Sequence, residues 1–152
     1  MLRPDVERMA DVERTASDHR IEELSGDECR ALLRRSHVGR LGVVRGGYPL
    51  IFPVNYGFHG ERVVIRTHAG AKLRGALYHR VSFEIDEIDY ESRCGWSVLV
   101  QGFGTELTAR DPGYAAMRHL TPAPWAPGER DRLLVIAPIS ITGRRITRRP
   151  DG

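Results

Sequence analysis

Lysine is nearly absent from this chain. Of its 23 basic residues, Lys72 is the one lysine and the others are arginines. Because 20 acidic residues offset them, the formal net charge is only +3, although the pI is near 9.2. Proteins that bind nucleic acid carry a pronounced basic surface. The composition therefore gives little support to nucleic acid as a partner, and the arginine pairs at 34–35, 144–145 and 148–149 remain candidate anion contacts.

Cysteines and long apolar runs are also scarce. Cys29 and Cys94 are far apart and show no C-x-x-C spacing, so we expect neither a zinc site nor a redox dithiol, and no other metal site. No apolar run approaches the roughly 20 residues of a membrane span. Residues 1–20 alternate acids and arginines and lack the apolar core of a secretory signal. We therefore expect a cytoplasmic protein that does not enter a membrane.

The length of the chain predicts one domain. A chain of 152 residues can bury roughly two-thirds of the surface that it exposes when unfolded, so it needs no disulfide or metal to fold. We expect a frayed or helical leader over residues 1–20, a domain over 21–147 and a short tail over 148–152.

Apolar periodicity predicts a mainly β protein with short helices. Ser25 and Glu28 form a capping-box pattern before a helix at about 26–36. Gly46 and Gly47 separate two apolar stretches and favour a tight hairpin. The spacing then predicts strands at 48–58 and 62–67, so that three strands form a meander.

The second half of the chain continues this pattern. Strands are predicted at 81–86, 96–107 and 133–136, with a short helix at 111–120 and a Pro-rich loop at 121–127. Gly102 and Gly104 predict a bend or bulge in the second of these strands. Six antiparallel strands interrupted by short helices favour a closed or nearly closed small barrel, because closure removes exposed strand edges.

The segment around Lys72 has the chemistry of a phosphate site. Arg66, Thr67, Gly70 and Lys72 lie between a β-branched run and a short helical pattern. Two cations, a hydroxyl and a glycine near a helix start attract anions. The alternative is that Lys72 is an ordinary solvated lysine.

Four blocks of residues, in order, resemble the flavin-binding split-barrel family, in particular its pyridoxamine 5'-phosphate oxidase-like branch, which includes nitroimidazole-reductase-like proteins. They lie at 24–41, 49–56, 66–73 and 81–102, and include Pro53-Val54-Asn55-Tyr56, Arg66-Thr67-x-x-Gly70-x-Lys72-Leu73 and Gly95-Trp96-Ser97-Val98. Residues 141–146 are similar to the end of that family's domain. The resemblance thus covers nearly everything after the leader.

The resemblance implies a homodimer of six-stranded antiparallel split β-barrels with FMN bound at the subunit interface. It places the phosphate on Arg66, Thr67, Gly70 and Lys72. The flavin ring would lie along Pro53, Val54, Asn55 and Tyr56, and Trp96 and Ser97 would approach from the partner subunit. Packing is the alternative role for these residues: Trp96 could plug the barrel, and Asn55 could close a turn.

The resemblance also implies an oxidoreductase that acts on a small molecule such as a nitro-aromatic or quinone-like compound. His68 is the one weak candidate for a proton donor, since a histidine can donate a proton near neutral pH, and a solvated loop residue is the favoured alternative. The substrate-binding segment of true pyridoxamine 5'-phosphate oxidases has no counterpart after Gly102, which argues against vitamin B6 oxidation. A deazaflavin coenzyme or haem is the alternative cofactor, and a non-catalytic carrier or redox sensor the alternative function.

Overall fold

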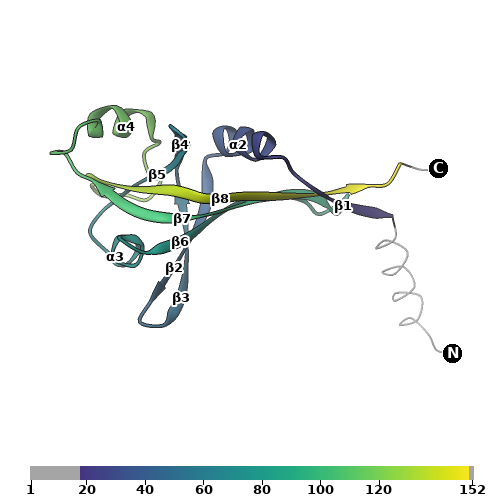
Figure 1. Ribbon diagram of the computed structural model, residues 1–152, viewed down its shortest axis with the longest axis horizontal. Coiled ribbons are helices and arrows are strands. Elements are labelled where there is room, and N and C mark those ends of the chain that lie inside the picture. Colours follow the sequence, from purple (N-terminus) through teal and green to yellow (C-terminus); the bar gives the residue numbers. More distant parts are fainter. Residues whose placement is uncertain (1–17, 151–152) are drawn as a thin grey trace.

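The computed structural model describes residues 18–150 (Figure 1). Most of the predicted leader lies outside the described residues, but His19 and Arg20 already belong to the first strand. The elements, in chain order, are β1 (His19–Glu23), α2 (Gly26–Arg35), β2 (Val38–Arg45), β3 (Tyr48–Asn55), β4 (Gly57–His59), β5 (Arg62–Thr67), α3 (Ala71–Ala76), β6 (Arg80–Asp89), β7 (Cys94–Leu107), α4 (Tyr114–Leu120) and β8 (Arg132–Arg148).

The strands form one antiparallel sheet in the order β3-β2-β6-β7-β8-β5-β4, with β1 paired to the far part of β8. In Figure 1, β7 and β8 run across the whole molecule, with α3 and α4 near one end and β1 at the other. The mainly β prediction is confirmed. The prediction was six strands in a closed or nearly closed barrel. Among the described residues the sheet has eight strands, and it is not closed, because its outer strands, β3 and β4, do not pair with each other.

Helix α2 begins as its sequence predicts. The Ser25 hydroxyl accepts a hydrogen bond from the Glu28 N–H at 3.2 Å, and the Glu28 carboxylate accepts one from the Ser25 N–H at 2.8 Å. This capping box satisfies two backbone donors that have no partner within the helix. Cys29, Leu32 and Leu33 then face the core.

Replacing Ser25 by alanine is expected to lower the free energy of unfolding by about 1 kcal/mol, because the N-cap acceptor is lost. Urea denaturation measures this change. Ser25→Thr retains the oxygen and serves as the control. Equal midpoints for Ser25→Ala and the wild type would show that the cap contributes nothing to stability.

The hairpin between β2 and β3 is confirmed, and Gly46 and Gly47 adopt left-handed backbone angles with φ of 57° and 80°. The three-stranded meander is wrong, since β5 pairs with β8 and β4 rather than with β3. The predicted 48–58 strand breaks at Tyr56. Its N–H donates to the His37 carbonyl at 3.1 Å and its hydroxyl to the Leu33 carbonyl at 2.8 Å, so the chain turns there toward the core.

Two glycines in β7, Gly102 and Gly104, allow β8 and α3 to pack closely against this strand. The β7–β8 register shifts between Gln101 and Gly102, which confirms the predicted bulge. A Cβ atom on Gly104 would lie 2.2 Å from the Ala76 carbonyl oxygen, so this glycine allows the end of α3 to pack directly on the strand. The sheet thereby fixes the position of the segment that precedes α3.

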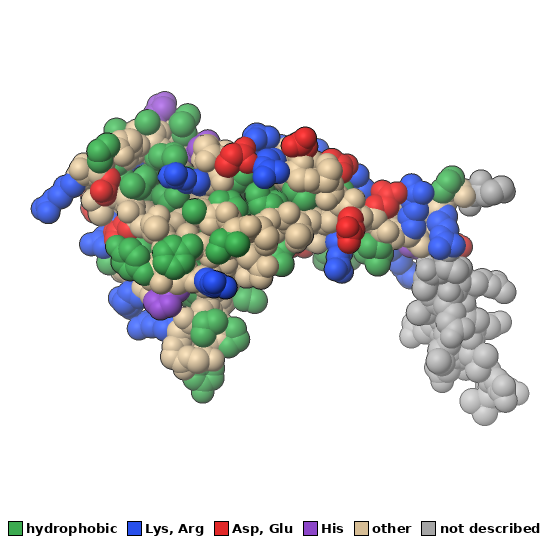
Figure 2. All heavy atoms as spheres, viewed as in Figure 1, with side chains coloured by type: hydrophobic (Ala, Val, Ile, Leu, Met, Phe, Trp, Pro, Cys, Tyr) green, Lys and Arg blue, Asp and Glu red, His purple; other side chains and the backbone are tan. Residues whose placement is uncertain are grey.

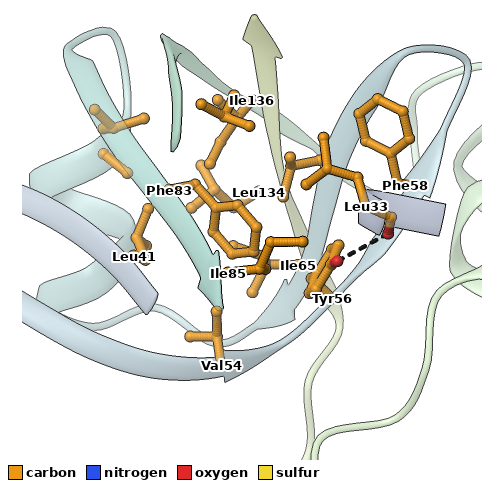
Figure 3. Packing of buried hydrophobic residues seen from close by; sticks show 14 of the residues in the cluster. Leu33, Leu41, Val54, Tyr56, Phe58, Ile65, Phe83, Ile85, Leu134 and Ile136 are labelled. Carbon is orange, nitrogen blue, oxygen red and sulfur yellow. Dashed lines mark hydrogen bonds between the residues drawn. The ribbon is translucent and has the colours of Figure 1, made fainter. Parts of the chain in front are cut away.

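The core lies inside the curve of the sheet, under α2 (Figure 3). Tyr56 and Phe83 meet edge to face there, with ring centroids 4.7 Å apart. A smaller apolar cluster of Val64, Leu133 and Val135 lies on the other face, next to α4. Within the described range 18–150, no helix is sufficiently long and apolar to span a membrane.

Candidate functional site

The predicted phosphate segment, residues 66–72, lies where β5 ends and α3 begins. We call this segment the phosphate corner. Arg66 and Thr67 are the last residues of β5, and Lys72 is in the first turn of α3. Thr67 is buried, and its hydroxyl donates to the His68 carbonyl at 3.3 Å. His68 itself is exposed, and its ring lies so close to Gly70 that a Cβ atom there would be 3.3 Å from Nε2. The strand, turn and helix thus follow in the predicted order.

Lys72 is half-buried and joins this corner to β3. Its Nζ atom lies 5.7 Å from the centroid of the Phe52 ring, a cation–π contact. Burial lowers the pKa of the Lys72 ammonium, and the nearby Arg130 guanidinium lowers it further. Lys72 forms no ion pair with any carboxylate among residues 18–150. A cation placed beside another cation and partly removed from water is stabilised by a bound anion.

Arg66 carries the clearest sign of a missing partner. Its Nε atom is buried and has no hydrogen-bond acceptor among the described residues. Most buried polar groups in proteins are hydrogen-bonded, and an unsatisfied charged donor costs more than a neutral one. The guanidinium of Arg66 also borders a cavity of about 420 Å³ next to the loop 121–131. Arg66 is therefore suited to bind an anion such as a phosphate.

The four residues at the end of β3 and just after it divide into buried and accessible ones. Val54 and Tyr56 are buried in the core, so their side chains are not available to a ligand. Pro53 is exposed and Asn55 half-buried. The Asn55 Oδ1 atom accepts a hydrogen bond from the Trp125 N–H at 3.0 Å and so holds the loop 121–131 next to β3.

Trp96 and Ser97 are not brought to the phosphate corner within one chain. They line a separate cavity of about 550 Å³, together with apolar residues of β1, β6 and β8. The Arg35 guanidinium lies 5.7 Å from the centroid of the Trp96 ring. A cofactor at the phosphate corner would meet Trp96 only if a second copy of the chain supplied it.

Two arginines that the sequence did not single out lie at the phosphate corner. Arg130, in the loop 121–131, acts electrostatically on Lys72, and Arg118, in α4, lines the same cavity as Arg66. They are distant from residues 66–72 in sequence and are two of many arginines. Only the fold, which packs α4 and this loop beside β5, brings them to the site.

Comparison with known proteins gives one consistent family. The pyridoxamine 5'-phosphate oxidase family matches residues 25–149. An uncharacterised protein of Mycobacterium tuberculosis is 35% identical over 136 residues, which cover 86% of this chain and 88% of the relative.

Two solved structures share the fold. An FAD binding protein of Mycobacterium smegmatis is 31% identical, with a TM-score of 0.64, and the match covers 83% of this chain and 98% of the other. A pyridoxamine 5'-phosphate oxidase-like protein of Corynebacterium glutamicum is 30% identical, with a TM-score of 0.71 and coverage of 86% and 96%.

Proposed function

Because this chain belongs to the pyridoxamine 5'-phosphate oxidase family, we propose that it binds a flavin and acts as an oxidoreductase on small molecules. The observation that carries the proposal is the buried, unpartnered Nε atom of Arg66, in the same short segment as the half-buried Lys72. Charge-assisted hydrogen bonds to a phosphate would satisfy both cations.

The residues of this corner have distinct tasks in binding. Arg66 presents a planar fork of donors and Lys72 a compact charge, so together they can hold a phosphate dianion. Gly70 keeps the backbone free of a side chain where the ligand approaches. Pro53 and Asn55 mark the strand along which the flavin ring would lie, and the backbone of Val54 and Tyr56 continues it.

FMN and FAD both carry a phosphate on the ribityl chain, so both fit this corner; the M. smegmatis relative is an FAD binding protein. A deazaflavin coenzyme or haem is the alternative cofactor. The bound flavin would supply the hydride or electron transfer, and the protein needs to provide only binding, orientation and a substrate gap. A nitro-aromatic or quinone-like compound suits such a gap, and the exposed His68 is the candidate proton donor.

A homodimer would complete the site. The β2–β3 hairpin and the adjoining sheet expose the apolar residues Val44, Ile51 and Ile139, which line a groove of about 370 Å³. In Figure 2 apolar side chains cover the tip of this hairpin. A second copy on this face would bury them and could bring its own Trp96 and Ser97 to the cofactor.

Replacing Ile51, which is 72% exposed, by arginine is expected to convert the dimer into a monomer, because a charge would then be buried in the interface. Light scattering after size-exclusion chromatography measures the mass. Leu120→Arg is the control, since Leu120 is an exposed residue of α4 away from this face. A dimer that survives Ile51→Arg, or a wild-type protein that is monomeric with flavin bound, would contradict the dimer proposal.

The experiment that tests the proposed function begins with an absorbance spectrum of the purified protein. The apo-protein is then titrated with FMN, FAD, a deazaflavin coenzyme and haem. We expect saturable flavin binding and oxidation of a reduced nicotinamide when a nitro-aromatic or quinone acceptor is added. Flavin binding without turnover would make the protein a carrier or redox sensor, and binding of no flavin would refute the proposal.

A further inference from the structure

A second cavity lies at the end of the sheet that carries β1, away from α3 and the phosphate corner (Figure 1). Its volume is about 550 Å³, within the range of small-molecule pockets. Strands β1, β6, β7 and β8 form its floor, and the turn from β6 to β7 adds Tyr90 and Arg93. Trp96 and Ser97 have a place in the proposed function, whereas the other residues of the cavity have none.

The floor of this cavity contains an apolar row with a gap in it. The row consists of Ile88, Gly95, Ile146 and Ile21, each paired with the next across β6, β7, β8 and β1. Directly paired residues face the same side of a sheet. Because adjacent strands are about 4.8 Å apart, β6 and β8 are separated by about 10 Å, with Gly95 between them. A Cβ atom on Gly95 would lie 2.5 Å from the Glu87 carbonyl oxygen, so no side chain can fill this gap. The slot between Ile88 and Ile146 therefore suits a flat ring.

A polar row adjoins the apolar one, two residues further along each strand and so on the same face of the sheet. In this row Asp86 pairs with Ser97, and Ser97 pairs with Arg144. The Asp86 carboxylate accepts a hydrogen bond from the Arg40 guanidinium at 2.6 Å, so its charge is already compensated. Arg144 forms no ion pair with a carboxylate among residues 18–150, not even with Glu23, which is opposite it on β1. The row thus presents a guanidinium that an anion can pair with.

The second carboxylate of the cavity is satisfied within its own turn. Asp89 accepts hydrogen bonds from the Ser92 hydroxyl at 2.6 Å and from the N–H groups of Glu91 and Ser92 at 3.0 and 3.4 Å. These bonds occupy most of its acceptor positions, so Asp89 has little capacity left for a cationic ligand. Arg93 adds positive charge to the same wall. The charges of the cavity therefore favour an anion.

We propose that this cavity binds a small molecule that combines a flat apolar ring with a carboxylate, such as an aromatic carboxylic acid. The ring would occupy the slot above Gly95, between Ile88 and Ile146. The carboxylate would accept charge-assisted hydrogen bonds from Arg144, whose planar fork of donors matches a carboxylate. The inference goes beyond the proposed function and does not require a bound flavin.

Isothermal titration calorimetry of the full-length protein with 2-naphthoate and with its neutral amide tests the inference. The acid should bind at least about tenfold more tightly than the amide, which has the same ring but no charge. Arg144→Gln should remove this preference and leave amide binding unchanged. Arg148→Gln is the matched control, because Arg148 is an exposed arginine of the same strand that does not line the cavity.

A second variant tests the position of the ring. Ile146→Ala shortens one wall of the slot and should weaken the binding of acid and amide by the same factor, because both ligands carry the ring. A variant that binds both ligands as tightly as the wild type does would place the ring elsewhere and overturn the inference.

Three further results would also overturn it: no binding of 2-naphthoate, equal affinity for acid and amide, or unchanged binding of the acid by Arg144→Gln. The titration needs no cofactor. It can therefore succeed where flavin binding fails, and fail where flavin binding succeeds, so the results distinguish this inference from the proposed function.

Discussion

Replacing Phe83 by alanine is expected to lower the free energy of unfolding by about 3–5 kcal/mol, the range for truncating a buried aromatic ring. Phe83 is fully buried in β6, and its ring packs edge to face on Tyr56. The ring also fills the space above Gly39, where a Cβ atom would lie only 2.2 Å from Phe83 Cζ. Alanine would leave a cavity between β2 and β6 that the backbone cannot close.

Urea denaturation measures this loss as a lower midpoint with an unchanged m-value. Tyr90→Ala is the control, because Tyr90 is 87% exposed, and it should change stability by no more than about 0.5 kcal/mol. A loss at Phe83 as small as that at Tyr90 would mean that the β6 core is not packed as described.

Replacing Lys72 by alanine is expected to weaken FMN binding by about 1.5–3 kcal/mol, or about 10- to 150-fold. The ammonium is half-buried, has no carboxylate partner among residues 18–150 and lies beside Arg130, so its charge is free to meet a phosphate. Arg74→Ala is the matched control, since Arg74 is an exposed cation of the same helix. Equal losses in the two variants would indicate a diffuse charge effect rather than a phosphate contact.

The affinity for FMN is expected to depend on pH in one direction. The pKa of Lys72 is lowered in the free protein, so the ammonium loses its proton at a lower pH than an ordinary lysine does. Only the protonated form attracts a phosphate. FMN affinity should therefore fall as pH rises through this lowered pKa, and Lys72→Arg, which stays charged, should abolish the fall.

Local signals in the sequence predicted local structure well. The capping box before α2, the Gly46–Gly47 reversal and the bulge at Gly102 each depend on neighbouring residues or on one glycine, and all three are present. Features set by long-range pairing were missed. Strand β1 lacks period-two apolar residues and exists because the far part of β8 offers it a partner.

The length of β8 and the break at Tyr56 have the same origin. The predicted strand 133–136 continues to Arg148, because β7 and then β1 pair with it along its length. Tyr56 matches the periodicity of a continuous strand, yet its hydroxyl bonds to Leu33 across the core and turns the chain. The local residue pattern identifies neither the strands that pair with β8 nor the Leu33 carbonyl that accepts the hydrogen bond from Tyr56.

The candidate site also has one part that the sequence predicted and another part that only the fold brings together. Arg66, Thr67, Gly70 and Lys72 lie within seven residues of one another, so their grouping followed from the sequence. Arg118 and Arg130 join them only through the packing of α4 and the loop 121–131 beside β5. Trp96 and Ser97 lie at a different cavity in the same chain, and their role in cofactor binding stays a prediction that requires a second copy.

The central claim is that Arg66 and Lys72 bind the phosphate of a flavin. The most direct measurement compares the affinities of riboflavin, which lacks the phosphate, and FMN for the wild type and Lys72→Ala. We expect the wild type to bind FMN more than about tenfold more tightly than riboflavin. We also expect Lys72→Ala to weaken FMN binding and to leave riboflavin binding unchanged. Equal affinity of the wild type for both ligands, or an equal loss for both in Lys72→Ala, would contradict it.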